Sequence, residues 1–399
     1  MIRAPWASLA RRACWLFALA QVNCSDIVQQ TLVAVAGAGS GGSDANGGAI
    51  SSGGHVDNGG STSGGSEGGA VAQAGDDSGG RAEGGGGNGN GGQTMAPCPD
   101  PVLSGFASVM DGTTGGDPSM RVIATNAAQL KTYATSTEPY VIEIPQTITL
   151  TEQIRPKSNK TIVGVGSQGV LTGGGFYIVS ASNIIIQNLT ITQLLSGEND
   201  AITVEKSKYV WIDHCDLSTS LSEPRGTYDG LIDVTHGSDF VTVSWTRLHD
   251  HYQVSVVGHS DNNALEDSGH LLVTWHHNFF QNVDSSTPRV RFGRAHLLNN
   301  YYLNVSGNAI SSQLGAEVVV EKNYFENVPF PLTTRYDPED GTAVSIGNDF
   351  DKSGGTPVIT EMSAWVPSTS YAYEADVTES VPLLVSQCAG VGKGSFSAP

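Results

Sequence analysis

Apolar and polar residues alternate with a period of two along much of the chain after residue 140, in short runs such as VIEI, TIVGVG and NIIIQNLTIT. Gly or Ser stands at the turns between these runs, and this period is typical of β-strands. One short helix is predicted over residues 127–135, where the Asn126 side chain can accept hydrogen bonds from the first free amides. Because helices nearly disappear from the chain, the pattern excludes a doubly wound α/β sheet and predicts an all-β fold.

An apolar strand returns at intervals of roughly 22 to 31 residues, a period typical of solenoids that stack one repeat on the next. Four of the six positions that we take as equivalent are Asn, which can form a hydrogen-bonded ladder between stacked coils. A β-sandwich with irregular strands is the alternative, but sandwiches do not repeat a turn Asn at one phase. The six positions are Asn188, Asp216, Arg247, Asn278, Asn300 and Asn323.

Three aspartates in the longer repeats form a candidate metal site. Asp229 and Asp233 of DGLID lie four residues apart, so in an extended chain both carboxylates leave the same face. A straight strand would separate their Cα atoms by roughly 13 Å, and Gly230 allows a bend that shortens this distance. Asp200 stands one repeat earlier, and three carboxylates with waters suit Ca²⁺. Two solvated aspartates at a strand edge are the alternative reading of DGLID.

Four histidines offer zinc as a competing metal, namely His249, His251, His276 and His277. They lack the HExxH pattern on a helix that many zinc enzymes use. Successive strand residues face opposite ways, so His276 and His277 cannot both bind one ion on the same face. The aspartates therefore remain the predicted ligands.

Two arginines of PRVRFG, Arg289 and Arg291, lie on the same face of a predicted strand. Planar guanidinium groups suit the bidentate capture of carboxylates, so this pair predicts a site for an acidic substrate. A pair of solvated or salt-bridged surface arginines is the alternative.

Composition divides the chain of 399 residues, whose formal charge of -19 argues against a nucleic-acid partner. Residues 1–20 place arginines before an apolar run too short to span a bilayer, which predicts a signal peptide, a secreted protein and no membrane span. A lipid anchor at Cys24 is the rival interpretation. Residues 21–95 form a Gly- and Ser-rich linker that we expect to be disordered. Residues 96–399 remain as one folded domain, expected to be a monomer.

Cysteine use fits export. Cys98 and Cys388 bracket the folded domain, and a bond between them would tie its ends together, although the sequence leaves the pairing open. Cys215 lies in an apolar strand and is expected to be a small buried residue.

The segments WIDHC, DGLID, SDFVTVSW, VVGHSD and PRVRFG, followed by HLLNNYY, resemble the successive motifs of the pectate lyase family, in the same order, from about Gly105 to about Val328. The resemblance implies a right-handed parallel β-helix that binds Ca²⁺ through Asp200, Asp229 and Asp233. It also implies cleavage of pectate (polygalacturonate), an acidic polysaccharide, by β-elimination. In this reaction the proton at C5 of a galacturonate is removed and the glycosidic oxygen at C4 leaves.

The chain departs from the family pattern at two basic positions. Arg291 matches a substrate-binding arginine, but the family's proton-abstracting arginine falls on Ser286 and its substrate-binding lysine falls on Gln253. A serine hydroxyl without a partner is a weak base, and Gln carries no charge. Arg289 is therefore the predicted base. A β-helix that binds acidic polysaccharide without cleaving it, and a structural solenoid on a flexible stalk, are the alternative functions.

Overall fold

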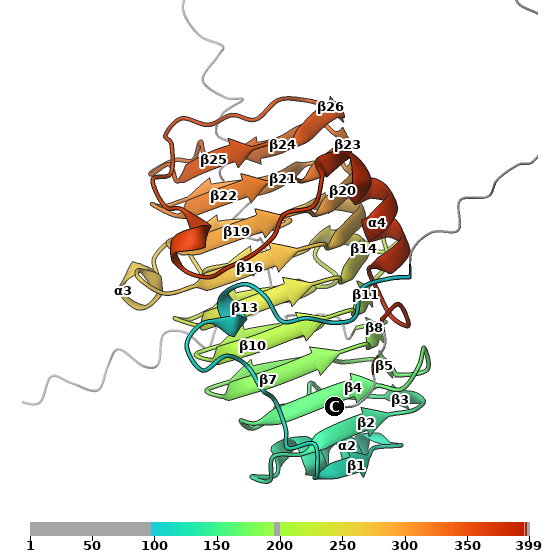
Figure 1. Cartoon of the computed structure of the whole chain (residues 1–399). Helices are drawn as coiled ribbons and strands as arrows, with labels where there is room; N and C mark the ends of the chain where they lie inside the picture. Colours follow the sequence, from blue (N-terminus) through green and yellow to red (C-terminus); the bar gives the residue numbers. More distant parts are fainter. Residues whose placement is uncertain (1–96, 195–199, 395, 397–399) are drawn as a thin grey trace, which may run out of the picture. The chain divides into compact units, whose positions relative to one another are not determined.

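The computed structural model describes residues 97–194, 200–394 and 396. The predicted signal peptide (1–20) and linker (21–95) lie outside the described residues. The described chain winds through three parallel β-sheets, and successive coils stack as drawn in Figure 1. For example, β10 (Lys208–Asp213), β11 (Asp216–Ser218) and β12 (Ile232–Thr235) belong to one coil and to three different sheets. This arrangement confirms the prediction of an all-β parallel β-helix.

The ten-stranded sheet, called sheet A, contains β1 (Arg121–Ile123), β2 (Val141–Ile144), β4 (Lys160–Gly164), β7 (Ser182–Gln187), β10, β13 (Asp239–Ser244), β16 (Leu272–His276), β19 (Arg294–Leu298), β22 (Glu317–Glu321) and β25 (Thr342–Ile346). The nine-stranded sheet B contains β3 (Thr147–Thr149), β5 (Val170–Thr172), β8 (Thr190–Thr192), β11, β14 (Arg247–Gln253), β17 (Phe279–Ser285), β20 (Tyr301–Val305), β23 (Tyr324–Val328) and β26 (Asp349–Gly354). The seven-stranded sheet C contains β6 (Phe176–Val179), β9 (Ile202–Glu205), β12, β15 (Val256–Val257), β18 (Arg289–Arg291), β21 (Asn308–Gln313) and β24 (Phe330–Thr333).

Like side chains stack on like side chains in the core because every coil repeats the same inward positions. In sheet B the inward row runs through Leu217, Leu248, Phe280, Tyr302 and Phe325. The Phe280 and Tyr302 rings are parallel with centroids 4.8 Å apart, and Tyr302 and Phe325 are 4.5 Å apart. All five side chains are fully buried, so this row fixes the register between neighbouring coils.

The predicted asparagine ladder is present in the later coils. The Asn278 side-chain amide donates to Asn300 Oδ1 at 3.0 Å, and Asn300 donates to Asn323 Oδ1 at 2.9 Å. The ladder continues to Asn348. This repeated interaction satisfies amide groups inside the stack, where an unpaired polar group would be costly.

The first three positions of the predicted repeat were wrong. The ladder passes through Thr246, whose N–H donates to Asn278 Oδ1 at 3.0 Å, and then through Cys215. Asp216 and Arg247 lie one residue later, paired with each other across the sheet, and Asn188 is likewise outside the ladder. The reason is that the inward row sets equivalence: the ladder residue stands two positions before Leu217, Leu248 and Phe280 in their coils.

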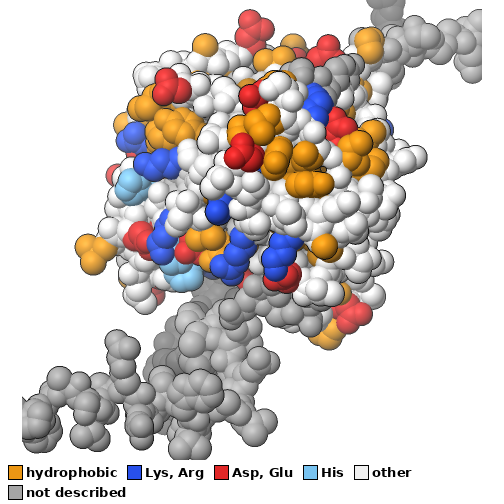
Figure 2. All heavy atoms as spheres, turned by 90° about the horizontal axis from the view of Figure 1, so that it is seen from below, with side chains coloured by type: hydrophobic (Ala, Val, Ile, Leu, Met, Phe, Trp, Pro, Cys, Tyr) orange, Lys and Arg blue, Asp and Glu red, His pale blue; other side chains and the backbone are white. Residues whose placement is uncertain are grey.

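Few helices are present among the described residues: α2 (Ala127–Thr135), α3 (Ala264–Asp267), α4 (Val381–Cys388) and the 3₁₀ turns η1 (Phe106–Ser108), η2 (Pro367–Thr369) and η3 (Thr378–Ser380). The predicted helix and its cap are confirmed, because Asn126 accepts from the Gln129 N–H at 3.0 Å. Leu130 and Ala134 of α2 join the core at the end of the stack near β1 (Figure 1). Figure 2, viewed from below this end, shows hydrophobic and charged side chains interspersed over the visible face.

The first and last segments of the described domain pack on the outer faces of sheets A and B. Phe106 of η1 packs against the rings of Trp365 and Tyr371 over sheet A. Cys98 and Cys388, whose pairing the sequence left open, form a disulfide, and α4 lies on the aromatic outer face of sheet B. Cys215 is buried and unpaired with another cysteine, as predicted. The candidate site therefore lies on the remaining sheet, sheet C, and on the turns that lead into it.

Candidate functional site

The predicted site residues come together along the outer face of sheet C. Asp233 lies on β12, and Arg289 and Arg291 lie on β18. Between them, Val256 of β15 pairs with Arg289, and its N–H donates to Asp233 Oδ1 at 2.9 Å. Asp233, Val256 and Arg289 thus follow one another in one outward row. Since neighbouring strands are about 4.8 Å apart, the backbones at Asp233 and Arg289 are separated by roughly 9.6 Å.

Two carboxylates of the predicted metal site face each other across Gly230. Asp200 is buried; its Oδ1 accepts from the Gly230 N–H and its Oδ2 from the Thr203 hydroxyl, each at 2.7 Å. A Cβ added at Gly230 would lie 2.6 Å from Asp233 Oδ1 and 2.9 Å from Asp200 Oδ1. Both oxygens therefore border a small space that exists only because residue 230 has no side chain.

The carboxylates of this site oppose one another electrostatically. Burial, together with the charge of Asp229, raises the pKa of Asp200 to about 6. Burial, Asp200 and Asp229 raise the pKa of Asp233 well above its usual value, and Arg291 opposes this shift. Among the described residues, no three His, Cys, Asp or Glu side chains form a ready metal cage. The structure thus gathers the three predicted aspartates but leaves the calcium site a prediction.

His251 holds the exposed Asp229 in position through the main chain. Its Nε2 donates to the Asp229 carbonyl at 2.6 Å, which leaves Nδ1 as the acceptor for the Thr219 hydroxyl, also at 2.6 Å. Burial lowers the pKa of His251, which favours this neutral form. The sequence offered His251 as a possible zinc ligand. Its partners instead give it a positioning role that the sequence pattern did not reveal.

The other histidines of the zinc alternative lie in different surroundings. His249 lies on β14 and contacts Asp216 at 3.0 Å and Asp250 at 2.7 Å. His276 ends β16 on sheet A, where its Nδ1 is 3.0 Å from Nδ1 of His277.

Arg289 and Arg291 are joined by a hydrogen-bonded network. Arg291 is buried, and its Nε donates to Asp261 Oδ1 at 2.6 Å. Arg289 is half-buried and donates to Gln313 Oε1 at 2.7 Å and to the Tyr336 hydroxyl at 3.1 Å. The Tyr336 hydroxyl in turn donates to Asp261 Oδ2 at 2.6 Å, closing the network. Arg291 is therefore a salt-bridged residue, and both guanidinium groups are held in fixed orientations.

Burial and the neighbouring charge of Arg291 lower the pKa of Arg289. Asp261 and Tyr336 oppose this shift. The sequence analysis did not single out Asp261, Gln313 or Tyr336. Each lies more than 20 residues from Arg289 in the chain, and only the packing of the coils brings them together.

Ser286 and Gln253 lie in neighbouring coils, each where the chain leaves sheet B for sheet C. Ser286 is buried with a φ of 61°, and its N–H donates to the Asn308 carbonyl at 3.0 Å. Gln253 is exposed at the end of β14, where it pairs with Ser285 of β17. The structure therefore brings both substituted positions to the same edge of the site.

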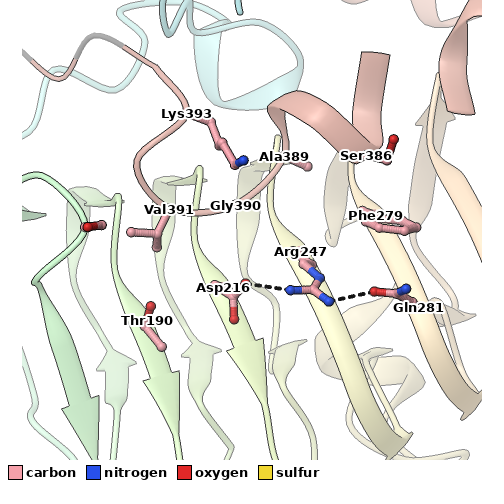
Figure 3. Close-up of a pocket in the computed structure, with 11 residues that line it drawn as sticks. Thr190, Asp216, Arg247, Phe279, Gln281, Ser386, Ala389, Gly390, Val391 and Lys393 are labelled. Carbon is pink, nitrogen blue, oxygen red and sulfur yellow. Dashed lines mark hydrogen bonds and ion pairs between the residues drawn. The ribbon is translucent and has the colours of Figure 1, made fainter. Parts of the chain in front are cut away.

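A second hollow lies on sheet B, next to α4 and the segment after it (Figure 3). Its floor includes Arg247, which binds Gln281 at 2.7 Å and approaches Asp216 at 3.5 Å. Its lining contains none of the predicted site residues. The predicted aspartates and arginines lie instead on or beside sheet C, so we place the candidate active site there.

Comparison with known proteins agrees with this fold. A family model described as pectate lyase matches residues 49–394. A probable pectate lyase B from Aspergillus flavus is 39% identical over 287 residues, which are 72% of this chain and 87% of the relative. Pectate lyase A from Aspergillus niger is 43% identical over 253 residues, which are 63% of this chain and 77% of the relative.

Solved structures agree as well. A pectate lyase from Bacillus sp. N165, in complex with trigalacturonate, has a TM-score of 0.65 at 31% identity and covers 73% of this chain and 99% of its own. Pectate lyase C from Erwinia chrysanthemi, at 24% identity, has a TM-score of 0.63 with coverage of 73% and 97%, and shows the fold alone.

The fold and these matches define a parallel β-helix of the lyase class that acts on polysaccharides. The chain belongs to the pectate lyase family, as its motifs indicated. The predicted enzyme class, a carbon–oxygen lyase acting on polysaccharides, is confirmed by the same matches.

Proposed function

We propose that this protein is a secreted lyase that cleaves pectate by calcium-assisted β-elimination. The observation that carries the proposal is the row on sheet C, which places the carboxylate of Asp233 and the guanidinium of Arg289 two strands apart. Such a row offers a metal end and a cationic end to one acidic chain. The complex of the Bacillus relative with trigalacturonate supports this class of substrate.

The residues of the acidic end fit a calcium ion. Asp200 and Asp233 present oxygens on either side of the space at Gly230, and Asp229 stands close enough to raise the pKa of both. Oxygen ligands of this kind suit Ca²⁺ better than softer metals. When bound, Ca²⁺ would draw charge from the substrate carboxylate and make the neighbouring C5 proton more acidic.

Arg289 is the proposed base. To accept a proton it must be in its neutral form, and its partial burial beside Arg291 favours that form. The C5 proton would pass to a nitrogen of Arg289, the electron pair would form the double bond between C4 and C5, and the C4–O bond would break. The departing oxygen takes up a proton from solvent. Gln313 and Tyr336 orient the guanidine for this step.

Secretion rests on the amino-terminal pattern and on the cysteines. The disulfide between Cys98 and Cys388 is typical of proteins that fold in an oxidising compartment. No helix within the described residues is long and apolar enough to cross a membrane. A lipid anchor at Cys24 remains the rival to release, and detergent partitioning of the processed protein would separate the two.

The test is the absorbance of unsaturated products formed from polygalacturonate by the purified protein, with Ca²⁺ and with a chelator. We expect absorbance to rise only with Ca²⁺ and to be lost in Arg289→Ala. Because Ser286 and Gln253 replace two basic residues of the family pattern, absence of product under every condition would favour the alternative of a binder that does not cleave.

A further inference from the structure

A loop from a single coil forms a wall beside the substituted edge of the site. This wall loop, residues 219–228, connects β11 to Asp229. Thr219 donates to His251 at its start, and the Tyr252 hydroxyl donates to the Leu221 carbonyl at 3.0 Å. These contacts hold the loop against β14, so that it runs along the edge where sheet B turns into sheet C.

Arg225 of the wall loop reaches the next coil. Its Nη1 is 2.7 Å from Asp284 Oδ2, and its Nη2 donates to Ser285 Oγ at 3.4 Å. Ser285 directly precedes Ser286 and pairs with Gln253 across the sheet. The guanidinium therefore contacts Ser285, which is next to both positions at which the chain carries a neutral residue in place of a basic one.

Arg225 differs from the other arginines of the site in its accessibility. Its side chain is 54% exposed, whereas that of Arg291 is 9% exposed and bound to Asp261. Arg289 is oriented by two partners and is half-buried. A guanidinium has five N–H donors, so Arg225 can keep Asp284 and still present donors to an incoming carboxylate.

We propose that Arg225 binds a uronate carboxylate of the substrate, and that it supplies from the wall loop the positive charge missing at Ser286 and Gln253. The proposal rests on the proposed function, since it assumes a polyuronate in the site. A substrate chain lying along the row from Asp233 to Arg289 would pass the wall loop on the side of Arg225. The loop leads directly into Asp229, so the metal end and this cation are borne by one segment.

An alternative role for Arg225 is purely structural, and we call it the staple role: the ion pair with Asp284 holds the wall loop in place, and the arginine does not contact substrate. The two roles differ in what Asp284 does. The staple role requires both members of the ion pair, so loss of either residue should have the same effect. Binding of substrate requires only Arg225, and removing the charge of Asp284 releases the guanidinium from its ion pair. The exposed pair is expected to contribute little to stability, so neither substitution should prevent folding.

The test compares Arg225→Gln, Arg225→Lys and Asp284→Asn in the full secreted protein. Binding of trigalacturonate, and of its methyl-esterified uncharged form, is measured by calorimetry with Ca²⁺ present. We expect Arg225→Gln to weaken trigalacturonate binding at least about tenfold, as for the loss of one charge-assisted bidentate contact. Arg225→Lys should lose less, and Asp284→Asn should bind as well as the parent or better. Binding of the esterified form should not change.

Equal losses in Arg225→Gln and Asp284→Asn would assign the staple role and overturn the proposal, as would wild-type affinity in Arg225→Gln. Restoration of binding in Arg225→Gln by Gln253→Lys would support it, because the second change returns a charge to the same edge. Failure of the parent to bind trigalacturonate overturns both this inference and the substrate assigned above. Binding without elimination overturns only the proposed cleavage, so the two failures are distinguishable.

Discussion

Asp233 and Arg289 occupy one outward row of sheet C, with only Val256 between them. A carboxyl group and a guanidine group therefore stand at a fixed separation of two strands on a rigid sheet, and the register that separates them is set by the buried rows on the other side. A site on a sheet face of this kind needs no loop movement to bring its two ends together. The following predictions test each end of the row.

Gly230→Ala should abolish the response to calcium. The added Cβ would lie 2.6 Å from Asp233 Oδ1, so the carboxylates would have to move apart. We expect the calcium concentration needed for half of the thermal shift to rise at least about tenfold, equivalent to ~1.4 kcal/mol of binding free energy. Gly166→Ala is the matched control: its Cβ meets nothing within 4 Å and it follows β4, away from the three aspartates. Its φ of 58° makes this substitution cost some stability, but its calcium response should be retained. A normal response in Gly230→Ala would place the ion elsewhere.

Asp233→Asn should stabilise the calcium-free protein and remove its stabilisation by calcium. The amide oxygen can still accept from the Val256 N–H, but the repulsion from Asp200 and Asp229 is relieved. At a calcium concentration of about 100 times Kd, the parent should gain ~2.7 kcal/mol of unfolding free energy. Denaturant unfolding with and without Ca²⁺ measures both effects. A variant that is less stable than the parent without calcium would show that the carboxylates do not repel one another.

Ser286→Arg combined with Gln253→Lys should raise elimination activity. The two positions lie at the same edge of the site, so the new charges would meet one substrate carboxylate. Because such groups act as a unit, each single substitution should show less than its share of the gain. The rate of unsaturated product formation at saturating Ca²⁺ is the measurement. An unchanged or lower rate in the double variant would show that this chain uses a different arrangement of bases.

Stability should fall in acid because of His276. This buried side chain has a pKa well below its usual value, owing to burial and to the neighbouring His277, His296 and His214. The unfolded chain takes up a proton near pH 6.5 and the folded protein does not, so stability is present above that pH and is lost as the pH falls below it. The loss attributable to this group is at most about 1.4 kcal/mol per pH unit.

The matched variant is His276→Gln, which stays neutral at every pH. At pH 8 the difference between variant and parent reports only the change in packing. Between pH 6.5 and pH 5 the parent should lose more unfolding free energy than the variant. Parallel curves over this range would exclude His276 as the source of acid sensitivity.

Local patterns in the sequence were sufficient for the class of fold. Period-two alternation and the recurrence of one apolar strand per repeat predict stacked parallel coils, because each coil can bury its apolar face only against its neighbours. The cap at Asn126 and the small buried Cys215 also depend on neighbouring residues alone. The three aspartates were found from their spacing and from the family motifs.

The tertiary structure decided which residues are equivalent and which meet across coils. Thr246 and Cys215 stand in the ladder where the repeat predicted Arg247 and Asp216, one residue later in each coil. The buried aromatic and aliphatic rows set this register, and a single repeat does not show which residues those rows will align in the earlier coils. Arg225 approaches Ser285, 60 residues later, because an insertion in one coil folds over the next. Contacts of this kind depend on where a loop packs in space, and local sequence patterns do not encode that position.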